Sequence, residues 1–166
     1  MTNYTPDDYD KYSCLKPGFW LYFAIFFAMK DVVLILVEAM SELKAKGATN
    51  NLSYFDQLVQ PEMILVNIIG LLVFISLIKR DPEVLGFWKK VFLKGRAFLI
   101  AAFVLHLLIL AYEQYLLTSE AYKWSKGISF QLIYMMAIDL IFLTAIITSE
   151  RVKIVFSEWP EATEAS

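Results

Sequence analysis

The stretch that decides the fold is "FAMKDVVLIL", residues 27–36, where Lys30 and Asp31 stand side by side inside a long apolar run. The run, residues 19–41, is long enough to cross a bilayer, because a hydrocarbon core of about 30 Å needs roughly 20 helical residues. A charged side chain at the bilayer centre costs at least ~2.5–3.5 kcal/mol on insertion scales. Two adjacent charges at that depth therefore predict polar partners on other helices.

The composition requires a solvent other than water. Of the 166 residues, 58% are hydrophobic and 16% aromatic, and the mean hydropathy is +0.55, whereas soluble domains have roughly 45–50% apolar residues. The net charge of -2 and the lack of zinc-finger, RNP or Gly-rich phosphate motifs argue against a nucleic-acid partner. The single cysteine, Cys14, excludes an intrachain disulfide and a cysteine-based metal cluster, and it predicts a buried or interfacial free thiol.

Three further apolar runs have the length of a membrane span. They cover residues 61–79, 96–117 and 127–149. Pro61 opens the first of these runs, where a helix tolerates proline, and Gly95 and Gly127 precede the other two. The sequence therefore predicts an all-α membrane protein with four transmembrane helices.

The distribution of basic residues predicts the orientation. The loop between the second and third spans contains Lys79, Arg80, Lys89, Lys90, Lys94 and Arg96, and the two opposite loops contain only Lys44 with Lys46 and Lys123 with Lys126. The positive-inside rule places the middle loop in the cytoplasm, and four spans then place both termini there. Within this loop, "PEVLGFWKKVFLK" from Pro82 has the spacing of a short amphipathic interfacial helix, which either rests on lipid headgroups or docks a partner.

The chain divides into three segments. Residues 1–18 form a cytoplasmic acidic and aromatic leader, residues 19–156 form the four-helix transmembrane domain, and residues 157–166 form a short acidic tail that we expect to be disordered. The leader has no apolar signal core or cleavage site, so we expect the first helix to be retained.

Polar residues of all four spans lie at one depth. Counted from the cytoplasmic end of each span at about 1.5 Å per residue, this depth is roughly 15–18 Å. The residues of this midplane layer are Lys30, Asp31, Asn67, His106 and Asp139. Because neighbouring residues of a helix point about 100° apart, we predict that Lys30 pairs with Asp139, and that Asp31 is protonated or matched by His106, with Asn67 donating and accepting nearby.

Two interpretations of this layer stay open. It is either a static ion-pair network that fixes helix register or joins subunits, or a titrating site that moves or senses protons or ions. A metal site is disfavoured, since one histidine with carboxylates lacks the paired ligand spacing of zinc sites. A catalytic site is disfavoured as well, because no Ser/Lys pair or histidine cluster of hydrolytic type occurs at a common depth.

Further polar residues lie toward the outer surface. Glu38 and Glu113 each follow a midplane residue by seven positions and so share its helix face, and Gln131 with Tyr134 lies on the outer half of the fourth span. They either line a polar path from outside to the midplane or extend into the headgroups.

The leader carries a family resemblance in "YTPDDYDKYSCLKPGFW", Tyr4 to Trp20. It resembles the opening of the YfeZ-like inner-membrane proteins of gammaproteobacteria, a family with a domain of unknown function. The matching residues are Pro6, Asp7, Asp8, Tyr9, Asp10, Cys14, Leu15, Lys16 and Pro17. The resemblance implies a bacterial inner membrane and supplies no activity.

The acidic residues of the leader predict a cytoplasmic docking contact. Asp7, Asp8 and Asp10 share a membrane side with the basic middle loop. The leader could therefore fold back on this loop and its Lys89, Lys90 and Lys94 as a local plug, or it could recruit another protein.

Together these observations predict a protein that is not an enzyme and needs no cofactor. We expect a scaffold or accessory subunit whose midplane charge network organises helix packing or oligomerisation, with the lipid bilayer and a second copy or another membrane protein as partners. The alternative is a proton- or ion-responsive component of a transport system that uses the midplane Asp, His and Lys residues.

Overall fold

The computed structural model describes residues 4–44, 63–84, 86–119 and 130–160, and the regular elements in these ranges are all helices. They are η1 (Pro6–Asp8), α1 (Phe19–Ala28), α2 (Lys30–Lys44), α4 (Ile64–Ile78), α5 (Gly86–Leu93), α6 (Gly95–Thr118), α7 (Phe130–Thr148) and α8 (Glu150–Ser157). The predicted all-helical class is confirmed for this part of the chain, and so is the predicted short helix in the middle loop, which is α5.

Two of the described helices, α6 and α7, are each long and apolar enough to cross a membrane. The bent pair α1 and α2 adds a third candidate if it counts as one span, whereas α4 is apolar but shorter over the described residues. The described part of the chain thus contains two to three candidate membrane spans.

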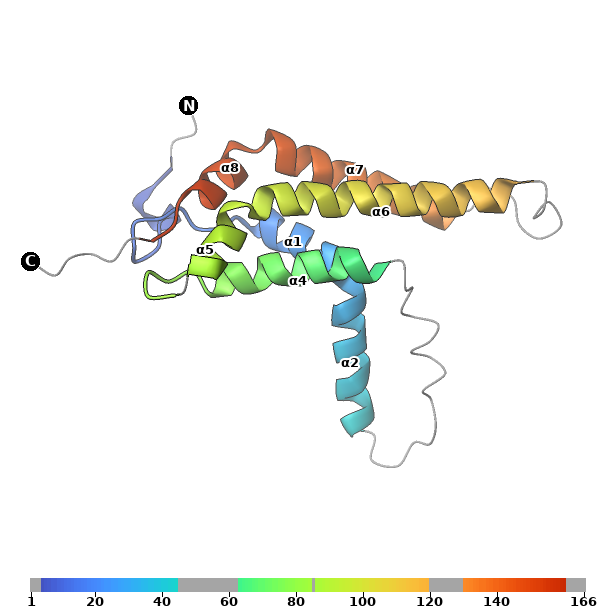
Figure 1. Cartoon of the computed structure of the whole chain (residues 1–166), viewed down its shortest axis with the longest axis horizontal. Coiled ribbons are helices and arrows are strands. Elements are labelled where there is room, and N and C mark those ends of the chain that lie inside the picture. Colours follow the sequence, from blue (N-terminus) through green and yellow to red (C-terminus); the bar gives the residue numbers. More distant parts are fainter. Residues whose placement is uncertain (1–3, 45–62, 85, 120–129, 161–166) are drawn as a thin grey trace, which may run out of the picture.

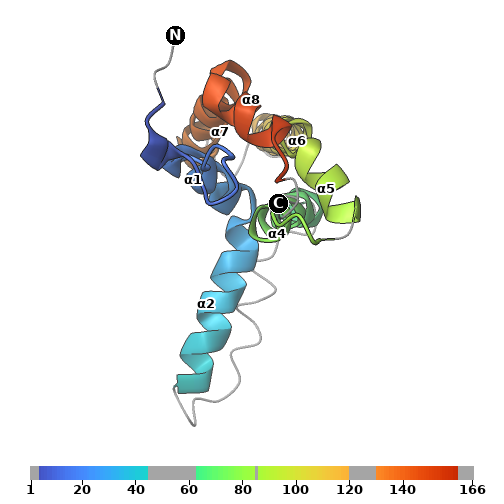
Figure 2. The same ribbon diagram turned by 90° about the vertical axis from the view of Figure 1, so that its left-hand side faces the viewer.

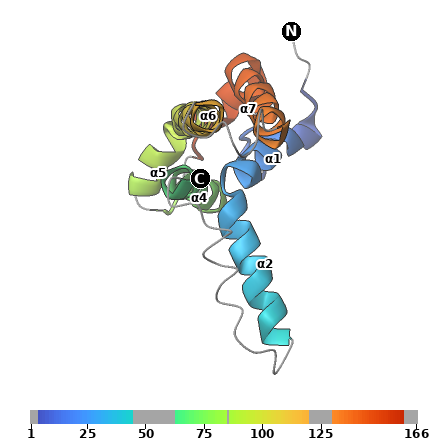
Figure 3. The same ribbon diagram turned by 90° about the vertical axis from the view of Figure 1, so that its right-hand side faces the viewer.

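The helices form an elongated bundle with one branch. In Figure 1, α4, α6 and α7 run along the long axis, and the leader, α5 and α8 gather at one end. Helix α2 diverges from this axis and leaves the bundle, and Figure 3 shows the same divergence from the other end.

The predicted first span is broken in its middle. Helix α1 ends at Ala28, α2 begins at Lys30, and the two axes differ by 77°. Gly70 of α4 lies against this break, since a Cβ atom there would be 3.1 Å from the carbonyl carbon of Ala28 and 3.2 Å from the backbone nitrogen of Met29. The prediction of one continuous helix over residues 19–41 is wrong, and Lys30 and Asp31 lie at the start of a new helix.

The core has an aromatic cluster in the bundle and another at its end. Phe27 of α1 lies 5.3 Å from Phe142 of α7, and Phe103 of α6 lies 5.7 Å from Phe142, measured between ring centroids. At the end of the bundle, Phe92 of α5 contacts Phe156 of α8 at 5.3 Å and Trp159 at 5.4 Å. Large apolar side chains in dense contact of this kind supply most of the stabilisation available to packed helices.

The beginning of the predicted acidic tail is part of this core. Trp159 is 9% exposed, and Pro160 is fully buried. The prediction of a disordered tail is therefore wrong for residues 157–160, because the indole ring packs on Phe92. Residues 161–166 lie outside the described part of the chain.

The close approach of α6 to α8 yields a first prediction. A Cβ atom at Gly95 would lie 2.4 Å from Cε1 of Phe156, whose side chain is 3% exposed and packed on Phe92. We expect Gly95→Ala to lower the free energy of unfolding by ~1–3 kcal/mol, the usual cost of overpacking a core. Thermal unfolding in detergent, followed by tryptophan fluorescence, measures this loss.

The matched control for Gly95 is Gly86→Ala. Gly86 is the first residue of α5, and a Cβ atom there would meet nothing within 4 Å. We expect this variant to be as stable as the wild type or slightly more so, because alanine has the higher helix propensity. Equal melting temperatures for the two variants would contradict the proposed contact between Gly95 and Phe156.

Candidate functional site

The predicted midplane residues form two separate polar contacts. The exposed fractions are 9% for Asp31, 7% for Asn67, 3% for His106 and 0% for Asp139, while Lys30 is half-buried. One contact lies at the break between α1 and α2, and the other joins α6 to α7.

At the break, the side chain of Asn67 holds the first turn of α2. Its Nδ2 donates to Oδ2 of Asp31 at 2.7 Å and to the carbonyl oxygen of Met63 at 2.9 Å, and its Oδ1 accepts from the backbone N–H of Asp31 at 3.2 Å. The first N–H groups of a helix have no partner within it, so Asn67 caps α2 from another helix. The carboxylate of Asp31 also lies where the helix dipole favours negative charge.

Lys30 pairs with its own neighbour. Its Nζ lies 3.3 Å from Oδ1 of Asp31, so the predicted pairing of Lys30 with Asp139 is wrong. The angle of about 100° between successive residues applies to the Cβ atoms, and the long flexible stem of lysine can still bring its ammonium group back to the adjacent carboxylate.

The second contact joins His106 of α6 to Asp139 of α7. Nδ1 of His106 lies 2.7 Å from Oδ2 of Asp139, and the Phe27 ring meets the imidazole edge-on with 6.2 Å between centroids. The carboxylate of Asp139 is thus paired with His106 and not with Lys30, and the predicted alternative in which His106 matches Asp31 is wrong as well.

This buried pair has unused hydrogen-bonding capacity. In the part of the chain that the structure describes, Nε2 of His106 has no hydrogen-bond partner and neither does Oδ1 of Asp139. Oδ2 of Asp139 accepts no aligned hydrogen bond either, although it lies 2.7 Å from Nδ1 of His106. Moving one proton between the two groups leaves their summed charge at zero, whereas gaining or losing a proton changes it by one.

Asn67 supports a second prediction. We expect Asn67→Ala to lower the free energy of unfolding by ~1–3 kcal/mol, because it leaves the buried carboxylate of Asp31 without its amide donor. Ser76→Ala on the same helix is the control: Ser76 is equally buried, but its hydroxyl donates to the carbonyl oxygen of Val73 within α4. Thermal unfolding of both variants should separate them, and similar losses would show that Asn67 contributes no more than a local contact.

The predicted outer polar path is not assembled in this structure. Figure 1 shows α2, which carries Glu38, diverging from α6 and α7, and the side chain of Glu38 lies outside the described residues. Glu113 is half-buried on α6, while Gln131 and Tyr134 are exposed on α7. The break at Met29 is the physical reason, since it turns the outer half of the predicted first span away from the bundle.

The leader does fold back on the bundle, and it contacts one basic residue of the middle loop, Arg80, together with Arg151 of α8. Oδ1 of Asp8 lies 2.9 Å from Nη2 of Arg151 in α8, and Oδ2 of Asp10 lies 3.8 Å from Nη1 of Arg80. Hydrogen bonds from Thr5, and then the Arg151 guanidinium, lower the pKa of Asp8 below its ordinary value. Asp7 is exposed. The predicted contacts of the leader with Lys89, Lys90 and Lys94 are wrong, because these side chains point to the exposed side of α5.

Arg80 fastens both ends of the described chain to the bundle. Its Nη1 donates to the carbonyl oxygen of Leu15 at 2.9 Å, and its Nη2 donates to that of Glu158 at 3.0 Å. The backbone N–H of Leu15 donates in turn to Oε2 of Glu158 at 2.8 Å. We call Arg80, Leu15 and Glu158 the Arg80 clasp. The Arg80 side chain is 5% exposed, and its guanidinium lies 5.0 Å from the centroid of the Phe92 ring.

The sequence that forms these contacts matches a known protein family. Over residues 4–158 the chain matches the family described as "Protein of unknown function (DUF2919)". The chain belongs to this family. No curated protein and no solved structure matches it. The family match spans the Arg80 clasp, the break and the His106–Asp139 pair, so all three lie within the DUF2919 domain.

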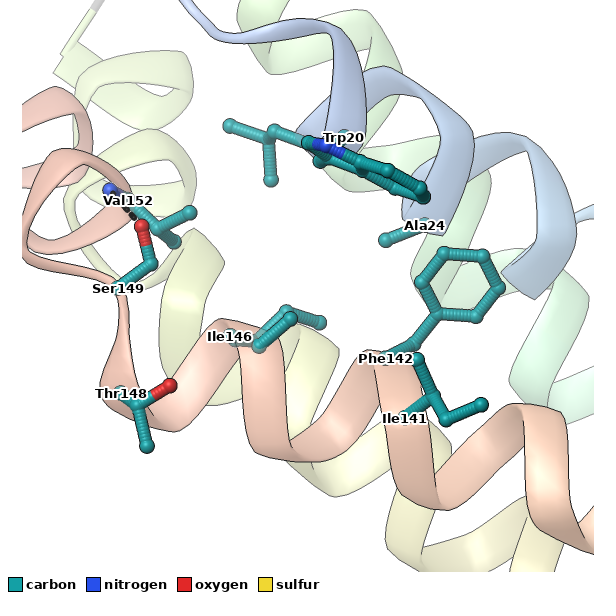
Figure 4. A pocket seen from close by; sticks show the side chains of 10 residues that line it. Trp20, Ala24, Ile141, Phe142, Ile146, Thr148, Ser149 and Val152 are labelled. Atoms are coloured by element: carbon teal, nitrogen blue, oxygen red, sulfur yellow. Dashed lines mark hydrogen bonds between the residues drawn. The ribbon is translucent and has the colours of Figure 1, made fainter.

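One groove of this DUF2919 domain is apolar. It lies between α1 and α7, has a volume of about 370 Å³, and is bounded by Trp20 and Ala24 on one side and by Phe142 and Ile146 on the other (Figure 4). Its hydroxyl groups are engaged by the chain itself: that of Thr148 donates to the Thr144 carbonyl, and that of Ser149 accepts from the backbone N–H of Val152. The groove thus suits a hydrocarbon chain better than a polar substrate.

Metal binding has no support in the described residues of this DUF2919 chain. They contain no group of three or more His, Cys, Asp or Glu side chains that could hold a metal ion. The same residues include one free thiol, Cys14, which is buried in the leader. The prediction was a buried or interfacial thiol, and the structure shows the first of these.

Proposed function

We propose that the protein is a non-enzymatic scaffold or accessory subunit of the bacterial inner membrane. The observation that carries this proposal is that two buried polar pairs each join separate elements of the fold. Asp31 with Asn67 connects α2 to α4, and His106 with Asp139 connects α6 to α7. Paired buried polar groups of this kind are suited to fixing the register and partners of helices in lipid.

We further propose four spans with both termini in the cytoplasm. The bent pair α1–α2, together with α4, α6 and α7, corresponds to the four apolar runs of the sequence. The leader, α5 and α8 lie at one end of the bundle, which is the arrangement that this topology requires (Figures 1 and 2). The resemblance of the leader to the YfeZ-like proteins supports a gammaproteobacterial inner membrane.

Cysteine labelling tests the topology. In a Cys14→Ser background, Lys90→Cys and Lys153→Cys should react with a membrane-impermeant maleimide only after cells are opened. Lys46→Cys and Lys123→Cys should react in intact spheroplasts. Labelling of Lys90→Cys from outside would overturn the proposed orientation.

The scaffold role is tested by exchanging partners. We expect His106→Asp combined with Asp139→His to restore the monodispersity that either single replacement reduces, because the exchange keeps both groups in contact. Liposomes containing the wild type should be no more permeable to protons than empty ones, and partner proteins should co-purify from native membranes. Failure of the exchange to restore folding would argue against a pairwise structural role.

A second candidate function is a proton- or ion-responsive component of a transport system. It is supported by the buried atoms of His106 and Asp139 that have no hydrogen-bond partner in the described residues, since such a site can change its proton content. A proton flux in wild-type liposomes that Asp139→Asn abolishes, without loss of monodispersity, would favour this function over the scaffold. Asp31→Asn, in the other polar contact, is the matched control.

A further inference from the structure

Helix α5 has one face fixed in the core and another that is free of acidic residues. On the inner face, Phe92 is 0% exposed and Val91 is 8% exposed. On the outer face, Leu93 is 42% exposed, and Phe87, at the edge between the two faces, is 61% exposed. Three lysines share that outer side and are all exposed: Lys89, Lys90 and Lys94.

Helix periodicity accounts for this division. At about 100° per residue, Trp88, Val91 and Phe92 fall within one arc, and Lys89, Lys90 and Leu93 fall within the opposite one. The inner arc is held by Phe156, Trp159 and the guanidinium of Arg80, which all contact the Phe92 ring. The outer lysines are therefore presented on a helix whose rotation is fixed.

The position of α5 in the molecule shows what its outer face meets. Figures 2 and 3 look along the bundle from its two ends, and in both α5 lies at the lateral edge, outside α4 and α6. Figure 1 places it at the end occupied by the leader and α8. Under the proposed topology, on which this inference rests, that position is the headgroup level of the cytoplasmic leaflet.

We propose that the outer face of α5 is a binding surface for anionic phospholipids. Lys89, Lys90 and Lys94 contact the headgroup phosphates, while Phe87 and Leu93 enter the boundary between headgroups and acyl chains. Lysine stems can follow apolar surface while their ammonium groups stay at the polar level. Each lysine near an anionic surface should increase the preference for anionic lipid about fivefold, and three should increase it on the order of 100-fold at low salt.

The charge of this surface favours lipid over a protein partner. The sequence of α5, "GFWKKVFL", contains no acidic residue, and Lys94 follows it directly. The cytoplasmic leaflet is the negatively charged surface that a lateral helix at this level adjoins. A docked protein would instead cover Phe87 and exclude lipid from Trp88, which gives the two occupants different experimental signatures.

Quenching of Trp88 by brominated lipid tests the proposal. The full chain is used with Trp20, Trp124 and Trp159 replaced by Phe, so that Trp88 is the one fluorophore, and it is reconstituted into nanodiscs. Dibrominated phosphatidylglycerol and dibrominated phosphatidylcholine are each mixed with unbrominated lipid of the other headgroup. We expect phosphatidylglycerol to occupy the site next to Trp88 with a preference of at least about tenfold over phosphatidylcholine, the order of magnitude expected for a screened surface charge. Salt at about 0.5 M should reduce this preference.

The variant Lys89→Gln/Lys90→Gln/Lys94→Gln should lose this preference while its melting temperature is unchanged. The matched control, Lys11→Gln/Lys79→Gln/Lys153→Gln, removes three other exposed lysines and should retain it. Equal quenching by the two lipids in the parent protein, or a preference that survives in the first variant, would overturn the proposal. So would a Trp88 that neither lipid quenches, because neither lipid then reaches α5. Failure of the topology itself is distinguished by labelling of Lys90→Cys from outside.

Discussion

Replacing Arg80 with methionine is expected to release the leader from the bundle and to lower the free energy of unfolding by ~3–5 kcal/mol. The guanidinium donates to two carbonyl groups that lie far apart in the sequence, those of Leu15 and Glu158. Hydrogen bonds that involve a charged group contribute roughly 1.5–3 kcal/mol each, and the carbonyls would lose their donor together. Methionine retains much of the apolar stem, so the loss reports mainly on the clasp.

The single cysteine provides a local readout of this release. Cys14 is 6% exposed, its backbone N–H donates to Oδ1 of Asp10, and burial raises the pKa of its thiol. Both features slow alkylation at neutral pH, because the thiolate is the reactive form. If the clasp contributes about 3 kcal/mol to holding the leader, maleimide labelling of Cys14 should become faster on the order of 100-fold in Arg80→Met.

Lys79→Met is the matched control, since Lys79 precedes Arg80 at the end of α4 and is exposed. We expect it to leave both the labelling rate and the melting temperature unchanged. Arg80→Lys should be intermediate, because one ammonium group cannot reproduce the two-pronged geometry of a guanidinium. A leader that stays protected in Arg80→Met would mean that the Asp8–Arg151 contact holds it without the clasp.

The sequence could predict the helices because the length of an apolar run is a local property. The runs over residues 61–79, 96–117 and 127–149 became α4, α6 and α7, with boundaries that moved by a few residues. The short helix in the middle loop followed from the spacing of its apolar and basic residues in the same way. Each of these predictions needed no knowledge of which helices are neighbours.

The break at Met29 could not be predicted in this way. The segment from Phe19 to Lys44 contains neither proline nor glycine, the usual causes of a kink. The break is stabilised from outside the segment, by the cap that Asn67 provides for α2 and by the close approach of Gly70. A local signal was nevertheless present, since an acidic residue such as Asp31 is common in the first turn of a helix.

The pairing of the midplane residues was wrong for a related reason. Counting depth along each span predicts which residues share a level, but it does not say which helices are adjacent. In the structure α6 packs along α7, so His106 is the residue that reaches Asp139. The structural role of Arg80 was not predicted, because basic residues in a loop were used as evidence for the orientation. The burial of Arg80 depends on its contacts with Leu15 in the leader and with Glu158 near the other end of the described chain.

The His106–Asp139 pair gives the second large effect, and the two single replacements should differ. His106→Leu is expected to lower the free energy of unfolding by ~3–5 kcal/mol at pH 7, because it leaves a fully buried carboxyl group without its partner. Asp139→Leu should cost less, ~1–3 kcal/mol. The reason is that a neutral imidazole is less costly to bury without a partner than an ionised carboxylate.

The difference between the two single losses is the diagnostic quantity, and thermal unfolding in detergent at pH 7 measures both. The double variant His106→Leu/Asp139→Leu removes both polar groups and should be more stable than His106→Leu alone, as expected when a buried pair is replaced by apolar residues.

Equal losses in the two single variants would contradict a charged contact and would point to the packing of both side chains. The expected asymmetry would instead mean that the buried carboxyl group of Asp139 depends on His106 alone among the described residues. The proposed scaffold function requires this dependence, because it makes the pair a structural contact between α6 and α7.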